Sequence, residues 1–97
     1  MDYELSLENV AGSLEITPAY LSRIVKKETG ITYKEYVTKL KMEKARELLL
    51  QEDMTVSKVC EKIGYTNVSY FIKLFKNYTG ETPAKWKENY NQNKNAL

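Results

Sequence analysis

The chain has 97 residues, of which 42% are hydrophobic and 29% charged, and its formal net charge is +2. This length and composition predict one small globular domain with a modest core, and they exclude a chain that stays disordered for want of apolar residues. The apolar runs are short and interrupted by Lys and Glu, and no basic segment precedes an apolar one near the start. We therefore expect neither a membrane span nor a signal peptide.

Positive charge is concentrated after the first nineteen residues. Residues 20–87 contain 14 Lys or Arg against 8 Asp or Glu, whereas residues 1–19 contain four acids and no base. Such an excess suits a polyanionic partner, although a charge-rich stretch is more often a solvated surface.

The first third of the chain predicts two helices joined by a tight turn. The first helix covers residues 7–13, although Gly12 is unfavourable inside it. Thr17 is the expected N-cap of a second helix over residues 18–29, since a proline follows it at the first helical position. Gly30 then ends this helix as a left-handed C-terminal residue.

The remainder also reads as helical. A long helix without Gly or Pro is predicted over residues 33–51, followed by shorter helices over residues 56–63 and 68–78. A last helix begins at the Thr-Pro pair and covers about residues 83–90, and the polar tail 91–97 is expected to fray. No strand pattern competes, so the chain predicts an all-α fold.

The sequence repeats itself at a spacing of fifty residues, which is forty-nine before the turn. The matching pairs include Tyr20 with Tyr70, Lys26 with Lys76, Gly30 with Gly80, Val10 with Val59 and Leu14 with Ile63. One unit therefore occurs twice, and the second copy has one more residue in its turn.

Each copy is a helix, a tight turn and a second helix, which is the arrangement of a helix-turn-helix unit. The first lies at about residues 7–29 and the second at about 55–79, with residues 33–51 as the linker. In such units the second helix enters the DNA major groove while the first braces it. The periodicity turns these residues outward: Ala19, Ser22, Arg23 and Lys26 in the first copy, and Ser69, Ile72, Lys73 and Lys76 in the second.

Both outer faces are small near the helix start and basic further along. Small groups let the backbone approach the bases, and long cations reach guanine edges or phosphates. A single surface helix with a basic stripe is more often merely solvated, but two matched faces favour DNA recognition. Ile72 is left open between a thymine-methyl contact and packing against its neighbours.

A family resemblance rests on the stretch GYTNVSYFIKLFKNYTGETPAKW, residues 64–86. It resembles the signature of the AraC family of bacterial transcription activators, through Gly64, Tyr65, Ser69, Tyr70, Phe71, Phe75, Lys76, Gly80, Thr82 and Pro83. LSRIVKKETG and KARELL resemble that family's first recognition helix and connecting helix. The resemblance covers about residues 5–90.

The resemblance implies one domain over residues 1–97, built of seven helices with two helix-turn-helix units joined by a long central helix. It implies base-reading residues at Ala19, Ser22, Arg23, Lys26, Val68, Ser69, Ile72 and Lys73. It also implies double-stranded DNA and RNA polymerase as partners, and an effector, dimerisation or receiver domain outside this chain. We expect a C-terminal fragment of a longer regulator, with a stand-alone regulator as the alternative.

The length of the linker supports this interpretation. A helix of about nineteen residues is about 28 Å long, and successive major grooves on one side of B-DNA lie about 34 Å apart. One chain can then place its two reading helices in adjacent grooves, and its site need not be palindromic. The alternative function is a protein-interaction module whose outer faces bind RNA polymerase or a partner domain.

Several residues outside the reading helices are assigned more briefly. Tyr36 and Trp86 are related by the repeat and are expected to be core or helix-docking aromatics. One or two of five lysines are expected to touch phosphates, and the others to be solvated: Lys34, Lys39, Lys41, Lys85 and Lys87.

The sequence offers little for catalysis. It has no His, no Gly-rich phosphate loop and no metal-ligand cluster, so we expect no enzyme, no cofactor and no bound metal. Cys60 is the lone cysteine and lies on an apolar helix face, where a small buried side chain is expected. A chain that cannot form an internal disulfide suits a reducing compartment, and we expect a cytoplasmic protein.

Overall fold

The computed structural model describes residues 6–96, and the side chains of residues 6–92. In this part of the chain six helices form and no strand does. They are α1 (Leu7–Ser13), α2 (Pro18–Thr29), α3 (Tyr33–Leu49), α4 (Val56–Lys62), α5 (Val68–Thr79) and α6 (Pro83–Ala96). The all-α prediction is confirmed. The described residues form six helices, whereas the resemblance implied seven for the whole domain.

Helix ends differ from the predicted ones where the last turn tightens or where a breaker is absent. The central helix α3 ends at Leu49 instead of residue 51, because the next two N–H groups bond to carbonyls three residues back. The last helix α6 extends beyond the predicted residue 90 to Ala96. No helix among residues 6–96 is long and apolar enough to cross a membrane.

The repeat extends to individual hydrogen bonds of the two turns. In the first turn the N–H of Ile16 donates to the carbonyl of Ala11, and in the second the N–H of Tyr65 donates to that of Cys60, at 3.0 Å in both. In each pair, four residues lie between the donor and the acceptor. Helices α1 and α4 therefore end in the same capping motif. The duplication is therefore structural as well as sequential.

The ends of α2 and α5, the second helices of the two units, are duplicated as well. Both stop at a glycine with positive φ, +80° at Gly30 and +88° at Gly80. The next threonine then caps the following helix. The hydroxyl of Thr32 accepts a hydrogen bond from the backbone N–H of Glu35 at the start of α3, and the hydroxyl of Thr82 accepts one from the backbone N–H of Lys85 at the start of α6.

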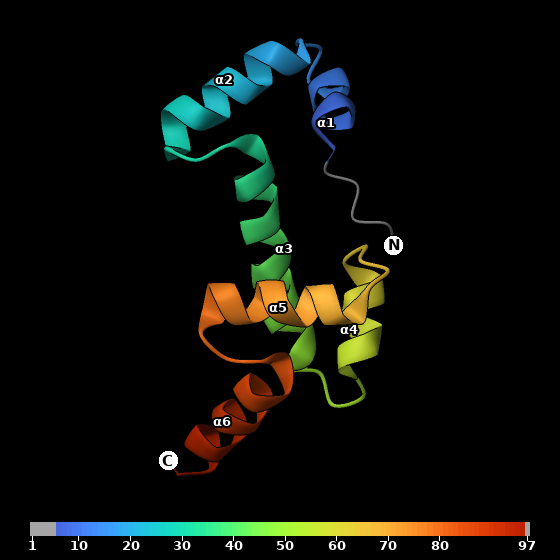
Figure 1. Cartoon of the computed structure of the whole chain (residues 1–97), viewed down its shortest axis with the longest axis vertical. Helices are drawn as coiled ribbons and strands as arrows, with labels where there is room; N and C mark the ends of the chain where they lie inside the picture. Colours follow the sequence, from blue (N-terminus) through green and yellow to red (C-terminus); the bar gives the residue numbers. More distant parts are fainter. Residues whose placement is uncertain (1–5, 97) are drawn as a thin grey trace.

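The central helix α3 is the axis of an elongated molecule of 48 × 26 × 23 Å (Figure 1). One end of α3 carries α1 and α2, the first unit, and the other end carries α4, α5 and α6, the second unit. Helices α2 and α5 both lie across α3, one near each end. With 17 residues, α3 is about 25 Å long.

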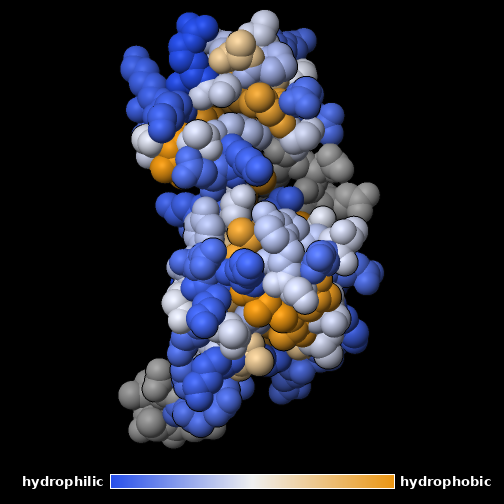
Figure 2. Space-filling view, in the orientation of Figure 1, coloured by the Kyte–Doolittle hydropathy of each residue, from blue (hydrophilic) through white to orange (hydrophobic). Residues whose placement is uncertain are grey.

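The buried core belongs almost entirely to the second unit and the adjoining part of α3. Its members, each at most 9% exposed, are Met42, Ala45, Leu48, Leu49, Val59, Cys60, Ile63, Phe71 and Phe75. In the first unit, Ala11 and Leu21 are the buried residues among those described. Figure 2 shows apolar atoms reaching the surface within both units, among hydrophilic side chains. The first unit therefore depends on the end of α3 for its packing.

Candidate nucleic-acid interface

The first reading helix, α2, is fixed at both ends by local chemistry. The hydroxyl of Thr17 accepts a hydrogen bond from the N–H of Tyr20 at 3.1 Å, and Pro18 occupies the first helical position. At the other end the ammonium of Lys26 donates to the carbonyl of Gly30 at 3.0 Å. Burial of Leu21 orients the helix and turns its opposite face outward.

The first outer face is accessible as the periodicity predicted. Ala19, Arg23 and Lys26 are exposed, whereas Ser22 is half-buried at the flank of the helix. Within the described residues the ion pair is Lys44–Glu47, at 3.7 Å, so no described carboxylate pairs with Arg23 or Lys26. These cations can therefore bind an external anion without breaking an internal ion pair.

The second reading helix, α5, is built in the same way but anchored more firmly. The side chain of Asn67 accepts from the N–H of Tyr70 at 3.0 Å. Phe71 and Phe75 are both fully buried, with ring centroids 6.0 Å apart. Trp86 of α6 packs edge-on against Phe75, also at 6.0 Å, as expected of a docking aromatic. The inward half of α5 is thus part of the main core.

The second outer face is more apolar than the first. Ser69, Lys73 and Lys76 are exposed, and Ile72 is half-buried. Val68 differs from the other candidate reading residues because it packs against the core cluster. The structure therefore brings the exposed cations of the two helices into equivalent positions, whereas Val68 is shared between the surface and the core.

Contacts to the first half of α3 join the second unit to the first. The hydroxyl of Tyr78 donates to the backbone carbonyl of Glu35 at 3.2 Å. A side-chain hydrogen bond joins Tyr65 to Thr38, and burial, followed by the nearby hydroxyl of Tyr70, raises the pKa of the Tyr65 hydroxyl above its ordinary value. Tyr65 and Tyr78 thus both reach from the second unit to the first half of α3.

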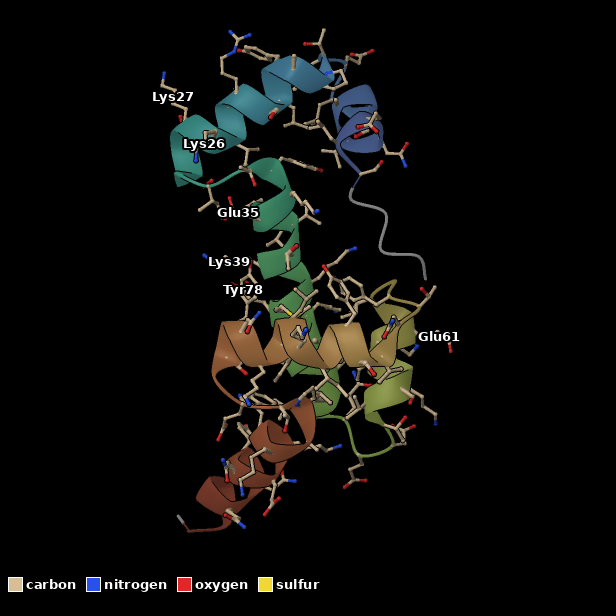
Figure 3. The ribbon with its side chains drawn as sticks, viewed as in Figure 1. Lys26, Lys27, Glu35, Lys39, Glu61 and Tyr78 are labelled. Carbon is tan, nitrogen blue, oxygen red and sulfur yellow. The ribbon has the colours of Figure 1, made fainter. Side chains whose placement is uncertain are left out.

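These tyrosine contacts were missed in the sequence because they break the repeat. The residues at the positions equivalent to Tyr65 and Tyr78 are Ile16 and Glu28. A search for matched positions passes over them, although the mismatch itself is the available signal. Figure 3 shows Tyr78 on the same side of α3 as Glu35 and Lys39.

The five lysines outside the reading helices divide into different environments. The ammonium of Lys87 donates to the carbonyls of Gln51 and Met54, at 3.4 and 3.2 Å, and so fastens the loop between α3 and α4. Lys34, Lys39 and Lys85 are exposed, and Lys41 is half-buried with its ammonium 4.9 Å from the centre of the Tyr65 ring. Lys87 therefore has an internal role that the sequence did not indicate.

A family model described as a helix-turn-helix domain matches residues 10–89. Among curated proteins, an uncharacterised HTH-type transcriptional regulator of Bacillus subtilis, YtdP, is 40% identical over 94 residues, which are 97% of this chain and 12% of YtdP. The chain also spans less than half the length of other curated relatives that it matches, such as PocR of Salmonella typhimurium, of which it covers 30%.

Solved structures share the fold over most of this chain. The crystal structure of a DNA-binding transcriptional dual regulator from Escherichia coli K-12 matches with a TM-score of 0.84 and 31% identity, over 92% of this chain and 79% of that chain. A transcriptional regulator from Chromobacterium violaceum, described as an AraC-type DNA-binding domain-containing protein, shares the fold with a TM-score of 0.81 and 23% identity, over 87% and 75% of the two chains. The chain thus belongs to the AraC family of helix-turn-helix transcription regulators.

Proposed function

We propose that this domain binds double-stranded DNA sequence-specifically, with α2 and α5 in adjacent major grooves, as the DNA-binding part of a bacterial transcription regulator. The observation that carries this proposal is the matched construction of the two reading helices at the two ends of α3. Both are capped by a side chain at the start, end at a left-handed glycine, and present exposed cations at equivalent positions. Two copies of a groove-binding helix on one rigid axis suit two successive grooves.

The dimensions agree with this placement. The 17 residues of α3 span about 25 Å, whereas successive major grooves lie about 34 Å apart. Figure 1 shows α2 lying beyond the start of α3, so the radius of α2 adds to its separation from α5. A modest bend of the duplex toward the protein supplies any remaining difference.

In each reading helix, small residues allow close approach to the DNA and cationic residues contact it. Ala19 and Ser69 let the start of each helix approach the bases, and Arg23 and Lys73 reach base edges or phosphates one turn later. Lys26 and Lys76 lie in the last turns and suit phosphate contacts. Ile72 is half-buried and suits a thymine methyl.

The direct test is selection of binding sites from random DNA, followed by footprinting of the selected duplex. We expect two protected stretches whose centres lie about 10–10.5 base pairs apart on one face of the DNA. Arg23→Ala is expected to weaken binding about tenfold or more and to relax base preference in only one stretch, consistent with about 1–3 kcal/mol for a good base contact. Protection of one groove alone, or unchanged affinity of the variant, contradicts the two-groove arrangement or the role of Arg23.

A protein-interaction module is the alternative function, since exposed faces on α2 and α5 are also able to bind a protein. The salt dependence of DNA binding distinguishes the two functions. Binding that neutralises phosphates weakens steeply between 50 and 200 mM salt, so we expect retention of a DNA duplex at low salt and its loss at high salt. Absence of DNA binding at low salt favours the interaction module.

The proposal also includes partners outside this chain. A regulator of this type acts in the cytoplasm as an activator that contacts RNA polymerase, and carries an effector, dimerisation or receiver domain. The length of the curated relatives supports a further domain, because this chain spans 12% of YtdP. Transcription in vitro from a selected site, with purified RNA polymerase and with or without this domain, tests activation directly.

A further inference from the structure

A hollow of about 920 Å³ lies between the two units on one side of α3. Its floor is one stripe of α3, formed by Lys34, Val37, Thr38 and Lys41 at the spacing of a single helix face. Ser22 of α2 lines it from the first unit, and Tyr70 of α5 lines it from the second. The hollow is therefore a junction between the two halves of the molecule.

The charges around this hollow are mainly positive. Lys34, Lys41 and Lys62 line it, and Glu61 is the acid among its lining residues. The ammonium of Lys41 lies 4.9 Å from the centre of the Tyr65 ring, which holds the cation in place without neutralising it. Lys34 and Lys62 are exposed, and neither forms an ion pair within the described residues. An anion is the occupant that this charge distribution favours.

The position of the hollow identifies the anion. Ser22 of the outer face of α2 lines the hollow, and the exposed Tyr70 lines it from α5. The hollow therefore adjoins the first outer face and reaches the first turn of the second reading helix. When two helices occupy successive major grooves on one side of B-DNA, the duplex between them presents its minor groove and the two phosphate backbones that border it. A basic hollow in this position faces a row of phosphates.

We propose that this hollow is the seat of the phosphate backbone that borders the minor groove between the two reading helices, with Lys34, Lys41 and Lys62 as its contacts. The inference rests on the proposed DNA binding and adds a third contact region to it. Because the contacts reach backbone and not bases, the region contributes affinity to any sequence and fixes the register of the two reading helices.

The test combines charge removal on both partners. Lys34→Gln and Lys41→Gln are each expected to lower the salt slope of binding by about 1, equally on a selected site and on unrelated DNA. On the DNA side, neutral methylphosphonate linkages are placed only in the backbone between the two protected stretches. These linkages should weaken the unaltered protein and should have a smaller effect on the Lys34→Gln, Lys41→Gln double variant, in which Lys62 remains.

Lys39→Gln is the matched control, because it removes the same charge from the same helix on the other side. Figure 3 shows Lys39 and the hollow-lining Glu61 on opposite sides of α3. This variant should keep the slope and the sensitivity to methylphosphonate of the unaltered protein. Since Lys41 packs on a tyrosine ring, Lys34→Gln, at an exposed position, serves as the variant that leaves this packing intact.

The possible results separate the two proposals. If the unaltered protein binds DNA but the slope and the methylphosphonate effect survive both substitutions, the hollow is not a backbone seat. If the variants leave DNA binding intact and instead weaken binding of another domain of the regulator, the hollow is a protein-docking site and the inference is wrong. If the unaltered protein retains no DNA at low salt, the proposed function itself fails.

Discussion

The hydroxyl of Tyr78, in the last turn of α5, donates a hydrogen bond across 43 residues of chain to the backbone carbonyl of Glu35, in the first turn of α3. The same end of α3 packs against α2. This bond therefore connects the second reading helix to the part of the axis that carries the first one. The residue at the equivalent position of the first unit is Glu28, so the repeat is broken where the two copies are joined.

Tyr78→Phe removes this bond while keeping the ring. We expect the free energy of unfolding to fall by about 0.5–1 kcal/mol, and we expect greater tolerance of one inserted or deleted base pair between the two half-sites. Urea unfolding and binding to a spacing series measure the two effects. Tyr90→Phe, whose ring stacks on Trp86, is the control and should leave the spacing preference unchanged. An unchanged spacing preference in Tyr78→Phe contradicts a role in positioning the helices.

The turn of the first unit contains a strained residue that its counterpart avoids. Glu15 has φ of +58°, and the equivalent residue of the second turn is Gly64, with φ of +91°. Because a left-handed conformation costs an L-residue about 1–2 kcal/mol and glycine loses about 0.4–1 kcal/mol through the unfolded chain, Glu15→Gly should stabilise the protein slightly, by up to about 1 kcal/mol. Thermal unfolding measures the change.

The reverse substitution is the matched control. Gly64→Ala places a side chain in the same backbone conformation, with no atom within 4 Å to clash with it. Its effect is therefore the backbone strain of about 1–2 kcal/mol less the gain of about 0.4–1 kcal/mol through the unfolded chain. We expect it to destabilise by up to about 1 kcal/mol. A stabilising Gly64→Ala, or a clearly destabilising Glu15→Gly, contradicts the account of the turn.

The uneven core predicts uneven local stability. Amide hydrogens of α1 and α2 should exchange faster than those of α4 and α5, because the cluster around Phe71 and Phe75 excludes the first unit. Leu21→Ala should raise exchange in the first unit at a cost of about 2–5 kcal/mol to its packing, while leaving most protection in α5. Hydrogen exchange read by NMR measures both, and equal protection in the two units is the opposing result.

Phe71→Ala supplies the comparison for this experiment. Phe71 is fully buried at the centre of the cluster, so its truncation should cost about 3–5 kcal/mol and raise exchange in all the helices together. The contrast between the two variants, one local and one global, is the quantity to measure.

Acid should weaken the start of α3 through Glu35. Its carboxylate accepts a hydrogen bond from the N–H of Thr32 at 3.1 Å, and this bond, then the Thr32 hydroxyl and nearby Lys26, hold the pKa of Glu35 below its ordinary value of 4.5. A carboxyl with a lowered folded pKa stabilises fully above its unfolded pKa and loses that contribution as pH falls through the folded value. Urea unfolding from pH 6 to pH 3 should therefore depend less on pH in Glu35→Gln.

Glu43→Gln is the control for this pH dependence. It removes one exposed carboxylate from the same helix, away from the cap. The variant should follow the unaltered protein through the whole range. If the free energy of unfolding falls equally with pH in Glu35→Gln and in the unaltered protein, the capping interaction is not the source of the pH dependence.

Features set by neighbouring residues were predictable from the sequence. Thr17 and Asn67 cap their helices as expected, and Gly30 adopts the left-handed conformation that its position required. Each of these depends on side chains within about four residues, so a local pattern contains the needed information. The exposure of Arg23 and Lys73 followed in the same way from helical periodicity.

Features formed between distant segments were not predictable. Nothing near Lys87 in the sequence indicates that its ammonium binds carbonyls of the loop after α3. The hollow beside Lys41 likewise arises only when both units pack on α3. Val68 shows an intermediate case, because the resemblance placed it among the base-reading residues, whereas it packs against the core cluster. Tertiary contacts decide such positions.

The concentration of buried side chains in the second unit has a consequence for synthesis. A ribosome releases α1 and α2 before α5, which contains Phe71 and Phe75. At about 5–20 residues per second, the first unit waits for seconds beside an incomplete axis before the main cluster can close. Premature termination after α3 would therefore leave a fragment that lacks the main core and cannot fold as a working half. The two units thus fold as one domain in spite of the duplication.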